Sequence, residues 1–256
     1  MMRPKARHKL QPFGHAAAVG RSLDVYYRDA ARHQRMDRLN AHFVPKGGLA
    51  FDIGAHVGDR TASFRRLGAR VVALEPQPHV FRALRLIHGR DPKTVLKSQA
   101  VGAQSAQMEM RINSVNPTVS TLSPDLVEAA HNASGWDDQV WDTSITVEVT
   151  TLDHMIQEYD LPDFIKIDIE GHELEALQGL SHAVPALSFE FTTLQRTVAD
   201  NCLRRLMALG DYEFNFSLGE EHRLIDHKWR AAKDMKDHLD KLPDTANSGD
   251  VYARLR

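Results

Sequence analysis

The stretch from Leu49 to Gly58 constrains the fold of this chain more than any other part of the sequence. It opens with an apolar run typical of a buried parallel strand, carries an acid at Asp52, and continues into a Gly-x-x-x-Gly turn at Gly54 and Gly58. Residues 59–67 then follow a helical pattern. A strand, a glycine turn and a helix N-terminus together let backbone approach a ligand closely, so we predict a ligand-binding turn here. A tight turn without a ligand is the alternative.

A second apolar strand, residues 70–74, ends at Glu75, which follows Asp52 by 23 positions. This spacing is typical of a βαβ unit in which the acid after the second strand accepts both hydroxyls of a ribose. The glycine spacing differs from the Gly-x-Gly-x-x-Gly of dinucleotide folds, and the carboxylate of Asp52 would repel a pyrophosphate. A ligand with an ammonium and a sulfonium, such as S-adenosylmethionine (SAM), suits that acid, so we expect SAM as the cofactor. A nicotinamide-dependent oxidoreductase is the alternative, which this glycine spacing disfavours.

Composition limits the remaining function classes. The chain has 256 residues, 42% of them hydrophobic, which suffices for one α/β domain with a full core. Its formal net charge of −2 provides no basic field, so we expect no nucleic-acid partner. The single cysteine, Cys202, excludes an internal disulfide, and we find neither a signal-peptide pattern nor a run of about 20 apolar residues. We therefore expect a cytoplasmic protein without membrane insertion, with Cys202 buried on a helix.

Periodicity divides the chain into two parts. We expect residues 1–44 to form a tail and one helix, from Ser22 to about Phe43, packed on the rim of the sheet near the ligand. Residues 45–256 alternate strand and helix patterns, which predicts a doubly wound α/β sheet with helices on both faces and an antiparallel last strand at its edge. The predicted strands of this sheet are 49–53, 70–74, 95–101, 163–169, 186–191, 212–216 and 251–255.

The middle of the chain is less regular. Alternating apolar residues predict two short strands, 108–112 and 145–150, outside the core of the sheet. Between them, residues 113–144 form a long insertion that contains Trp136 and Trp141. Insertions of this length in a compact domain are usually functional or disordered.

A second dense stretch, residues 163–173, carries several charges within an apolar strand pattern. Because side chains alternate across a strand, we expect Lys166, Asp168 and Glu170 to share one face. A strand buried on both faces rarely carries charges without a role, and ligands bind at the carboxyl ends of such strands. We therefore expect Asp168 and Glu170 to project into the crevice beside the glycine turn. A structural ion pair with Lys166 is the alternative, and His172 suits a base as well as a residue that begins a helix.

Together these motifs resemble the FkbM family of SAM-dependent methyltransferases, over roughly residues 45–218. The segments that carry the resemblance are 51–58 (FDIGAHVG), 74–76 (LEP), 100–102 (AVG), 151–153 (TLD), 165–173 (IKIDIEGHE) and 189–191 (FEF). The resemblance implies a Rossmann-like class I methyltransferase sheet. The family's better-known members methylate hydroxyls on sugars or macrolide-type natural products, so it also implies a SAM-dependent O-methyltransferase with a sugar, glycan or natural-product acceptor. A SAM-binding partner module without catalysis is the alternative class.

The expected cofactor site draws on both strand ends. We expect the glycine turn to face the methionine part of SAM, with Asp52 near its ammonium. We expect Glu75 to bind the ribose hydroxyls, and Gln77 and the Ala100–Val101 edge to flank the adenine. The expected SAM-binding residues are Asp52, Gly54, Ala55, His56, Gly58, Glu75, Pro76, Gln77, Ala100 and Val101.

An alcohol acceptor is a poor nucleophile, so we also expect a general base. Asp168 is the first candidate because it lies at the strand end, and Glu170 and His172 are the others. Ser120 and Thr121 are expected near SAM or the acceptor. We expect no metal, because the sequence shows no third clear oxygen ligand; a divalent cation held by Asp168 and Glu170 is the alternative, since carboxylates suit magnesium.

Overall fold

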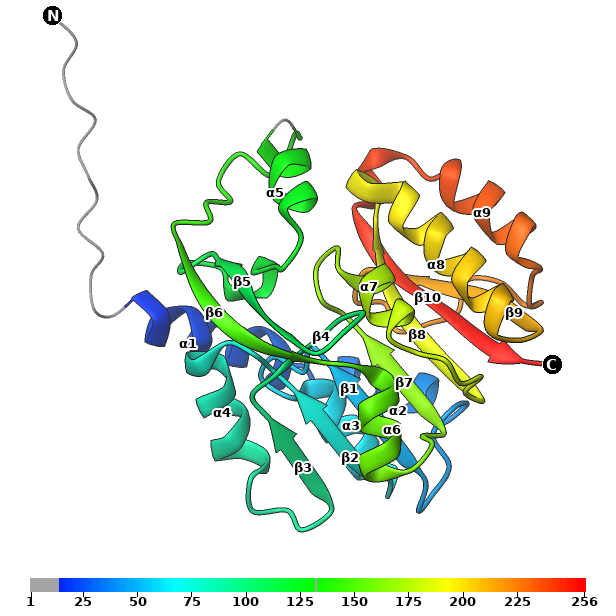
Figure 1. Ribbon diagram of the computed structural model, residues 1–256, viewed down its shortest axis with the longest axis horizontal. Helices are drawn as coiled ribbons and strands as arrows, with labels where there is room; N and C mark the ends of the chain where they lie inside the picture. The colour runs from blue at the N-terminus through cyan, green and yellow to red at the C-terminus, as the bar shows by residue number, and fades with distance from the viewer. Residues whose placement is uncertain (1–13, 132) are drawn as a thin grey trace, which may run out of the picture.

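The computed structural model describes residues 14–131 and 133–256, so residues 1–13 of the expected tail lie outside the described part. A seven-stranded sheet forms the centre of the molecule, in the order β3-β2-β1-β7-β8-β10-β9 (Figure 1). Its strands are β1 (Leu49–Ile53), β2 (Arg70–Leu74), β3 (Thr94–Lys97), β7 (Phe164–Ile167), β8 (Ala186–Thr192), β9 (Tyr212–Leu218) and β10 (Ser248–Leu255). Neighbouring strands from β3 to β8 are parallel, whereas β10 is antiparallel to both β8 and β9. The predicted sheet and its antiparallel last strand are confirmed, but β9 rather than β10 forms the edge.

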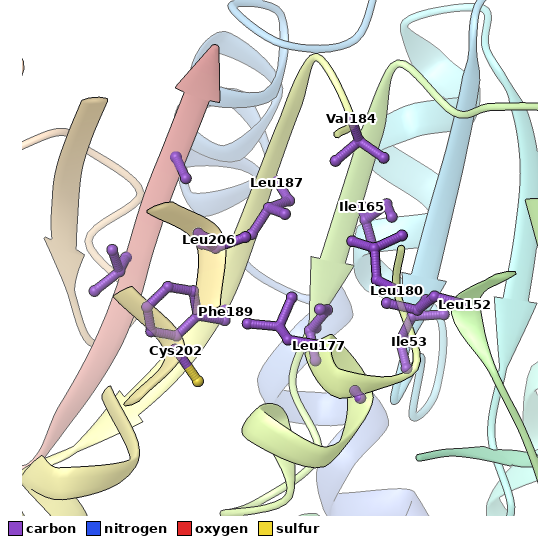
Figure 2. Packing of buried hydrophobic residues seen from close by; sticks show 14 of the residues in the cluster. Ile53, Leu152, Ile165, Leu177, Leu180, Val184, Leu187, Phe189, Cys202 and Leu206 are labelled. Carbon is purple, nitrogen blue, oxygen red and sulfur yellow. The ribbon is translucent and has the colours of Figure 1, made fainter. Parts of the chain in front are cut away.

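Alternate side chains of the central strands point to opposite faces of the sheet. Both faces are apolar, because these strands carry apolar residues at consecutive positions. Phe51 of β1 belongs to one hydrophobic cluster and Ala50 to another. The first face is covered by α6 (Leu152–Tyr159), α7 (Glu173–Gln178), α8 (Arg196–Leu209) and α9 (Ala232–Asp240), and the second by α3 (Asp59–Arg66) and α4 (Pro78–His88). Figure 2 shows the first cluster, in which Phe189 of β8 and Cys202 of α8 are both buried. Cys202 is therefore a core residue, as predicted.

Three further strands form a separate sheet in the order β4-β6-β5. They are β4 (Ala100–Val101), β5 (Ala106–Ile112) and β6 (Thr143–Thr150). The prediction of a single strand over residues 95–101 is therefore wrong, because β3 and β4 are separate strands. The chain leaves the main sheet after Lys97, because Ala100 and Val101 pair with β6 instead of continuing along β2. The insertion between β5 and β6 contains a 3₁₀ turn, Pro117–Val119, and α5 (Pro124–His131).

Two helices, α1 (Gly14–Tyr27) and α2 (Ala30–Asn40), replace the single helix predicted over residues 22–43. They separate because Asp29 is extended and caps α2, accepting a hydrogen bond from the Arg32 amide at 3.0 Å. The hydroxyl of Tyr27 donates to the carbonyl oxygen of Val57 at 2.9 Å, which attaches α1 to the glycine turn. Within residues 14–131 and 133–256, no helix combines the length and hydropathy needed to cross a membrane.

Candidate active site

A cavity opens at the carboxyl ends of β1, β2, β7 and β8, where doubly wound sheets place their ligands. The cavity is open to solvent at its mouth, and about 130 Å³ of it can be occupied by the centres of water molecules. The predicted SAM-binding residues that line it are Asp52, Gly54, Ala55, His56, Glu75, Pro76, Gln77, Ala100 and Val101. Gly58 is not among the lining residues, because it precedes α3 and faces Leu84 and His88.

The glycine turn is held between β2 and the end of β7. The amides of Gly54 and Ala55 donate to the carbonyl oxygen of Leu74 at 3.0 and 2.8 Å, which fixes the turn against β2. Gly54 has a φ of +78°, and a Cβ built on it would lie 1.8 Å from the carbonyl oxygen of Asp168. Only glycine fits this position, in conformation and in space.

His56 extends from the turn toward α1. Its ring meets the ring of Tyr26 edge-on, with centroids 5.8 Å apart. The buried Nε2 of His56 has no hydrogen-bond partner in the described part of the chain, and burial lowers the pKa of the imidazole to about 4. His56 is therefore neutral at physiological pH and presents an unpaired ring nitrogen at the cavity wall.

The two predicted cofactor acids hold their carboxylates in different ways. Glu75 accepts hydrogen bonds from the amides of His56 at 3.1 Å and Gln77 at 2.8 Å, while burial raises its pKa to about 7. Asp52 accepts a hydrogen bond from the hydroxyl of Thr61 at 2.5 Å, and burial raises its pKa to about 6. A carboxylate oxygen has two lone pairs, so both groups keep acceptor capacity for a ligand.

Lys166 organises the charges at the end of β7. It is paired in register with Asp52 of β1, so the two side chains share one face of the sheet. Its Nζ lies 2.9 Å from Oδ2 of Asp168 and 3.0 Å from Oδ1 of Asp250. The ion pair that the sequence left as an alternative is therefore present. Burial alone would raise the pKa of Asp168, but Lys166 lowers it below its usual range.

Glu170 reaches the cavity by a different route from the one predicted. Strand β7 ends at Ile167, so the alternation of side chains does not extend to Glu170. The chain turns there, because Glu170 has a φ of +55° and its carbonyl oxygen accepts a hydrogen bond from the hydroxyl of Thr121 at 2.6 Å. Thr121 thus holds the turn without lining the cavity, whereas Ser120 does line it.

Glu190 of β8 completes the acidic cluster, and the prediction missed it. One carboxylate oxygen each of Asp168, Glu170 and Glu190 lies within 4.8 Å of the other two. Burial and repulsion from Asp168 raise the pKa of Glu170 and Glu190 well above the usual range. The signal was available, since Glu190 is a charge inside an apolar strand, as Lys166 is. Three carboxylate oxygens suit a divalent cation, and Glu190 is the third ligand that the sequence analysis did not identify. The absence of a metal stays a prediction.

His172 lies apart from this cluster. It directly precedes α7, is buried, and is not among the residues that line the cavity. Its Nδ1 lies 3.7 Å from a carboxylate oxygen of Glu175, and its Nε2 has no hydrogen-bond partner among the described residues. Of the three predicted candidates for a base, the structure brings together Asp168 and Glu170 only.

A further part of the cavity wall comes from residues that the prediction did not name, one of them in the helix that was expected near the ligand. It consists of Tyr26 of α1, Asp59 and Arg60 of α3, and Glu220 in the loop after β9. Polar residues on short helices and loops are usually solvated, so the sequence carried no signal for these positions.

Comparison with known proteins agrees with this geometry. The sequence model of the Methyltransferase FkbM domain matches residues 52–223. A curated relative, the hexuronic acid methyltransferase AglP of Haloferax volcanii, is 26% identical over 183 residues, which cover 71% of this chain and 70% of the relative.

Solved structures that match this chain at low sequence identity include two methyltransferases. A TehB-like SAM-dependent methyltransferase from Corynebacterium glutamicum is 12% identical, with a TM-score of 0.46 over 94% of this chain and 96% of that one. A precorrin-6y C5,15-methyltransferase from Geobacter metallireducens is 12% identical, with a TM-score of 0.43 over 89% of this chain and 86% of that one. The family match covers most of the chain, and on that ground the protein belongs to the FkbM family and is a SAM-dependent methyltransferase.

Proposed function

We propose that this enzyme methylates a hydroxyl of a sugar or glycan. The observation that carries the proposal is the cluster of Asp168, Glu170 and Glu190 beside the glycine turn, since carboxylates accept hydrogen bonds and protons from hydroxyl groups. The curated relative, which acts on a hexuronic acid by its name, supports a sugar acceptor.

The residues around the glycine turn fit the cofactor. Glu75 combines a fixed carboxylate with a position at the end of β2, which suits the hydroxyls of a ribose. The backbone at Gly54 and the acid of Asp52 suit the amino-acid part of SAM, while Gln77 and the β4 edge, Ala100–Val101, suit the adenine. SAM supplies a methyl group bonded to a positively charged sulfur, which is an electrophilic carbon with a good leaving group.

Transfer then requires the protein to orient the acceptor and accept one proton. The acceptor oxygen forms a bond to the methyl carbon, the carbon–sulfur bond breaks with its electron pair kept by sulfur, and the hydroxyl proton passes to Asp168. Lys166 keeps Asp168 ionised and therefore ready to accept the proton. Glu170 and Glu190 are placed to orient the acceptor hydroxyls, and we assign no part in proton transfer to His172.

The test is methyl transfer from radiolabelled SAM to a panel of uronic acids, neutral sugars and oligosaccharides. We expect label in a sugar, in a form that mild alkali does not release, because a methyl ether is stable there. Label on a nitrogen, or no transfer to any sugar, would contradict the proposal. A parallel arm with a chelator determines whether a divalent cation at the three carboxylates takes part.

A further inference from the structure

A second group of charges lies at the cavity wall around Arg60 and Glu220. Glu220, in the loop after β9, places its Oε2 at 3.1 Å from Nε of Arg32 and 3.5 Å from Nη2 of Arg60. The Nε2 of His222 lies 3.0 Å from the same oxygen. Asp59 contacts both arginines, at 2.8 Å from Arg32 and 3.1 Å from Arg60. Both guanidinium groups therefore pair with the same two carboxylates, those of Asp59 and Glu220.

The two arginines are buried, whereas the side chain of Glu220 is half exposed. The side chains of Arg32 and Arg60 are only 6% and 12% exposed, whereas that of Glu220 is 49% exposed. Asp59, itself 9% exposed, holds the two arginines from the protein side. Two preorganised guanidinium groups with one solvent-accessible anion form a carboxylate-binding geometry.

Glu220 also stands between the cavity and the outside. It lines the cavity, and it lines a second hollow on the surface together with Arg35 and Arg223. Arg35 lies 4.0 Å from a carboxylate oxygen of Asp29, and Arg223 lies 3.4 Å from one of Glu221. The side chains of these two arginines are 40% and 75% exposed. An anionic molecule in this hollow therefore meets two exposed arginines beside Glu220.

The arginine pair is connected to the catalytic cluster by an unbroken series of ion pairs. Arg60 lies 3.9 Å from Asp250, Asp250 lies 3.0 Å from Lys166, and Lys166 lies 2.9 Å from Asp168. Along this series Lys166 is already occupied by two carboxylates, so it has little capacity for a third. Arg60 lines the cavity and Arg32 lies behind Glu220, and each arginine pairs with the exposed Glu220 as well as with the buried Asp59.

We infer that Arg32 and Arg60 form a subsite for the carboxylate of an acidic sugar, and that Glu220 occupies this subsite until the acceptor displaces it. An incoming carboxylate replaces one negative charge by another, so the two buried cations are never left unpaired. The inference rests on the proposed function and narrows it to a uronic acid, whose carboxylate lies on the arginines while a ring hydroxyl faces Asp168.

Binding to wild-type protein tests the inference first. The full chain, saturated with S-adenosylhomocysteine, is titrated in a calorimeter with glucuronate and with glucuronamide, which has the same ring without the charge. We expect glucuronate to bind at least about tenfold more tightly, a preference that weakens with added salt because it is electrostatic. Equal affinity for the two compounds would overturn the inference, and this comparison needs no variant.

A matched pair of variants tests the displacement. Glu220→Gln keeps the side-chain shape and removes the competing charge, so we expect glucuronate to bind about fivefold more tightly or better, with glucuronamide unchanged. Glu221→Gln removes the neighbouring charge, which contacts the exposed Arg223, and should change neither affinity by more than about twofold. If Glu220→Gln has no more effect than Glu221→Gln, Glu220 is a fixed part of the wall and the displacement is wrong. Unchanged affinity for S-adenosylhomocysteine verifies that both variants are folded.

The product separates this inference from the proposed function. An alkali-stable methyl group on glucuronate supports both. An alkali-labile methyl ester overturns both, because the carboxylate is then the methyl acceptor. An alkali-stable methyl group together with equal affinity for glucuronate and glucuronamide overturns the subsite alone. Selective binding of glucuronate without transfer to any sugar supports the subsite and contradicts the proposed function.

Discussion

The α-carbon of Gly54 lies so close to the carbonyl oxygen of Asp168 that a Cβ on Gly54 would come within 1.8 Å of it. This contact joins the two motifs that the sequence singled out, the turn after β1 and the end of β7. The turn that we assign to SAM and the carboxylate that we assign to proton transfer are thus held together by backbone, so neither moves without the other.

Replacing Gly54 by alanine should therefore disturb both motifs. The Cβ meets backbone that cannot rotate away, in addition to the cost of a positive φ, which is about 1–2 kcal/mol for an alanine. Gly47→Ala is the matched control, because Gly47 has a similar φ of +82° with no atom within 4 Å of its Cβ. We expect Gly47→Ala to cost only the backbone term and to bind SAM normally, and Gly54→Ala to lose SAM binding by calorimetry. Equal behaviour of the two variants would show that the contact does not matter.

Glu75→Gln should weaken SAM binding by roughly 1.5–3 kcal/mol, because it removes a charged acceptor for hydroxyl groups. Calorimetry against Glu128→Gln, a change at an exposed glutamate of α5, measures the difference. An affinity equal to that of the control would mean that the carboxylate of Glu75 only supports the amides of His56 and Gln77.

Glu75 also makes the stability of the cofactor-free protein depend on pH. Burial raises its pKa from 4.5 to about 7, so between these values the folded state keeps a proton that the unfolded state has lost. The contribution of Glu75 to stability is therefore present below pH 4.5 and is lost as pH rises toward 7. We expect denaturant unfolding to show Glu75→Gln gaining on the order of 3 kcal/mol relative to wild type from pH 4.5 to pH 7.5. A constant difference between the two proteins over this range would contradict the burial of the charge.

Tyr27→Phe tests whether α1 is part of the catalytic domain. The hydroxyl of Tyr27 bonds to the carbonyl oxygen of Val57 and lies 3.2 Å from Nε2 of His88, so its loss should cost about 1 kcal/mol of stability. Tyr159→Phe, whose hydroxyl donates to the side chain of Glu158 at the surface, should cost less than about 0.5 kcal/mol. Thermal unfolding compares the two. If Tyr27→Phe lowers the stability no more than Tyr159→Phe does, α1 is not part of the catalytic domain, and the predicted division into residues 1–44 and 45–256 stands.

Most of the main strands were predictable because apolar residues predominate or alternate in them between clear turns. The break after Lys97 was not predictable, because the sequence from Val95 to Val101 fits a single strand. The break arises because Ala100 and Val101 pair with β6, which is distant in the sequence. The break at Asp29 followed the same logic, since its capping bond to the Arg32 amide competes with a helix pattern that continues through it.

The candidate site divides in the same way. Asp52, Glu75 and Asp168 lie in dense local motifs at strand ends, so spacing alone placed them around one cavity. Arg60 and Glu220 reach that cavity through the packing of α3 and of the loop after β9, and a charged residue in such a segment is ordinarily solvated. No local pattern distinguishes them.

We assign to Asp168 the role of accepting the proton of the acceptor hydroxyl. Asp168→Asn preserves the shape of the side chain and removes its basicity, while Glu190→Gln changes a neighbouring carboxylate that we assign to orientation. Both variants are measured with and without a chelator, so that loss of a bridging cation is distinguished from loss of a base. Calorimetry with SAM verifies that each variant keeps its fold and its cofactor site.

The deciding measurement is the turnover of Asp168→Asn, followed as transfer of labelled methyl from SAM to the best sugar acceptor of wild type. We predict a fall of about 10²-fold or more, with SAM affinity within about twofold of wild type and a smaller fall in Glu190→Gln. Turnover equal to wild type in Asp168→Asn would contradict the account.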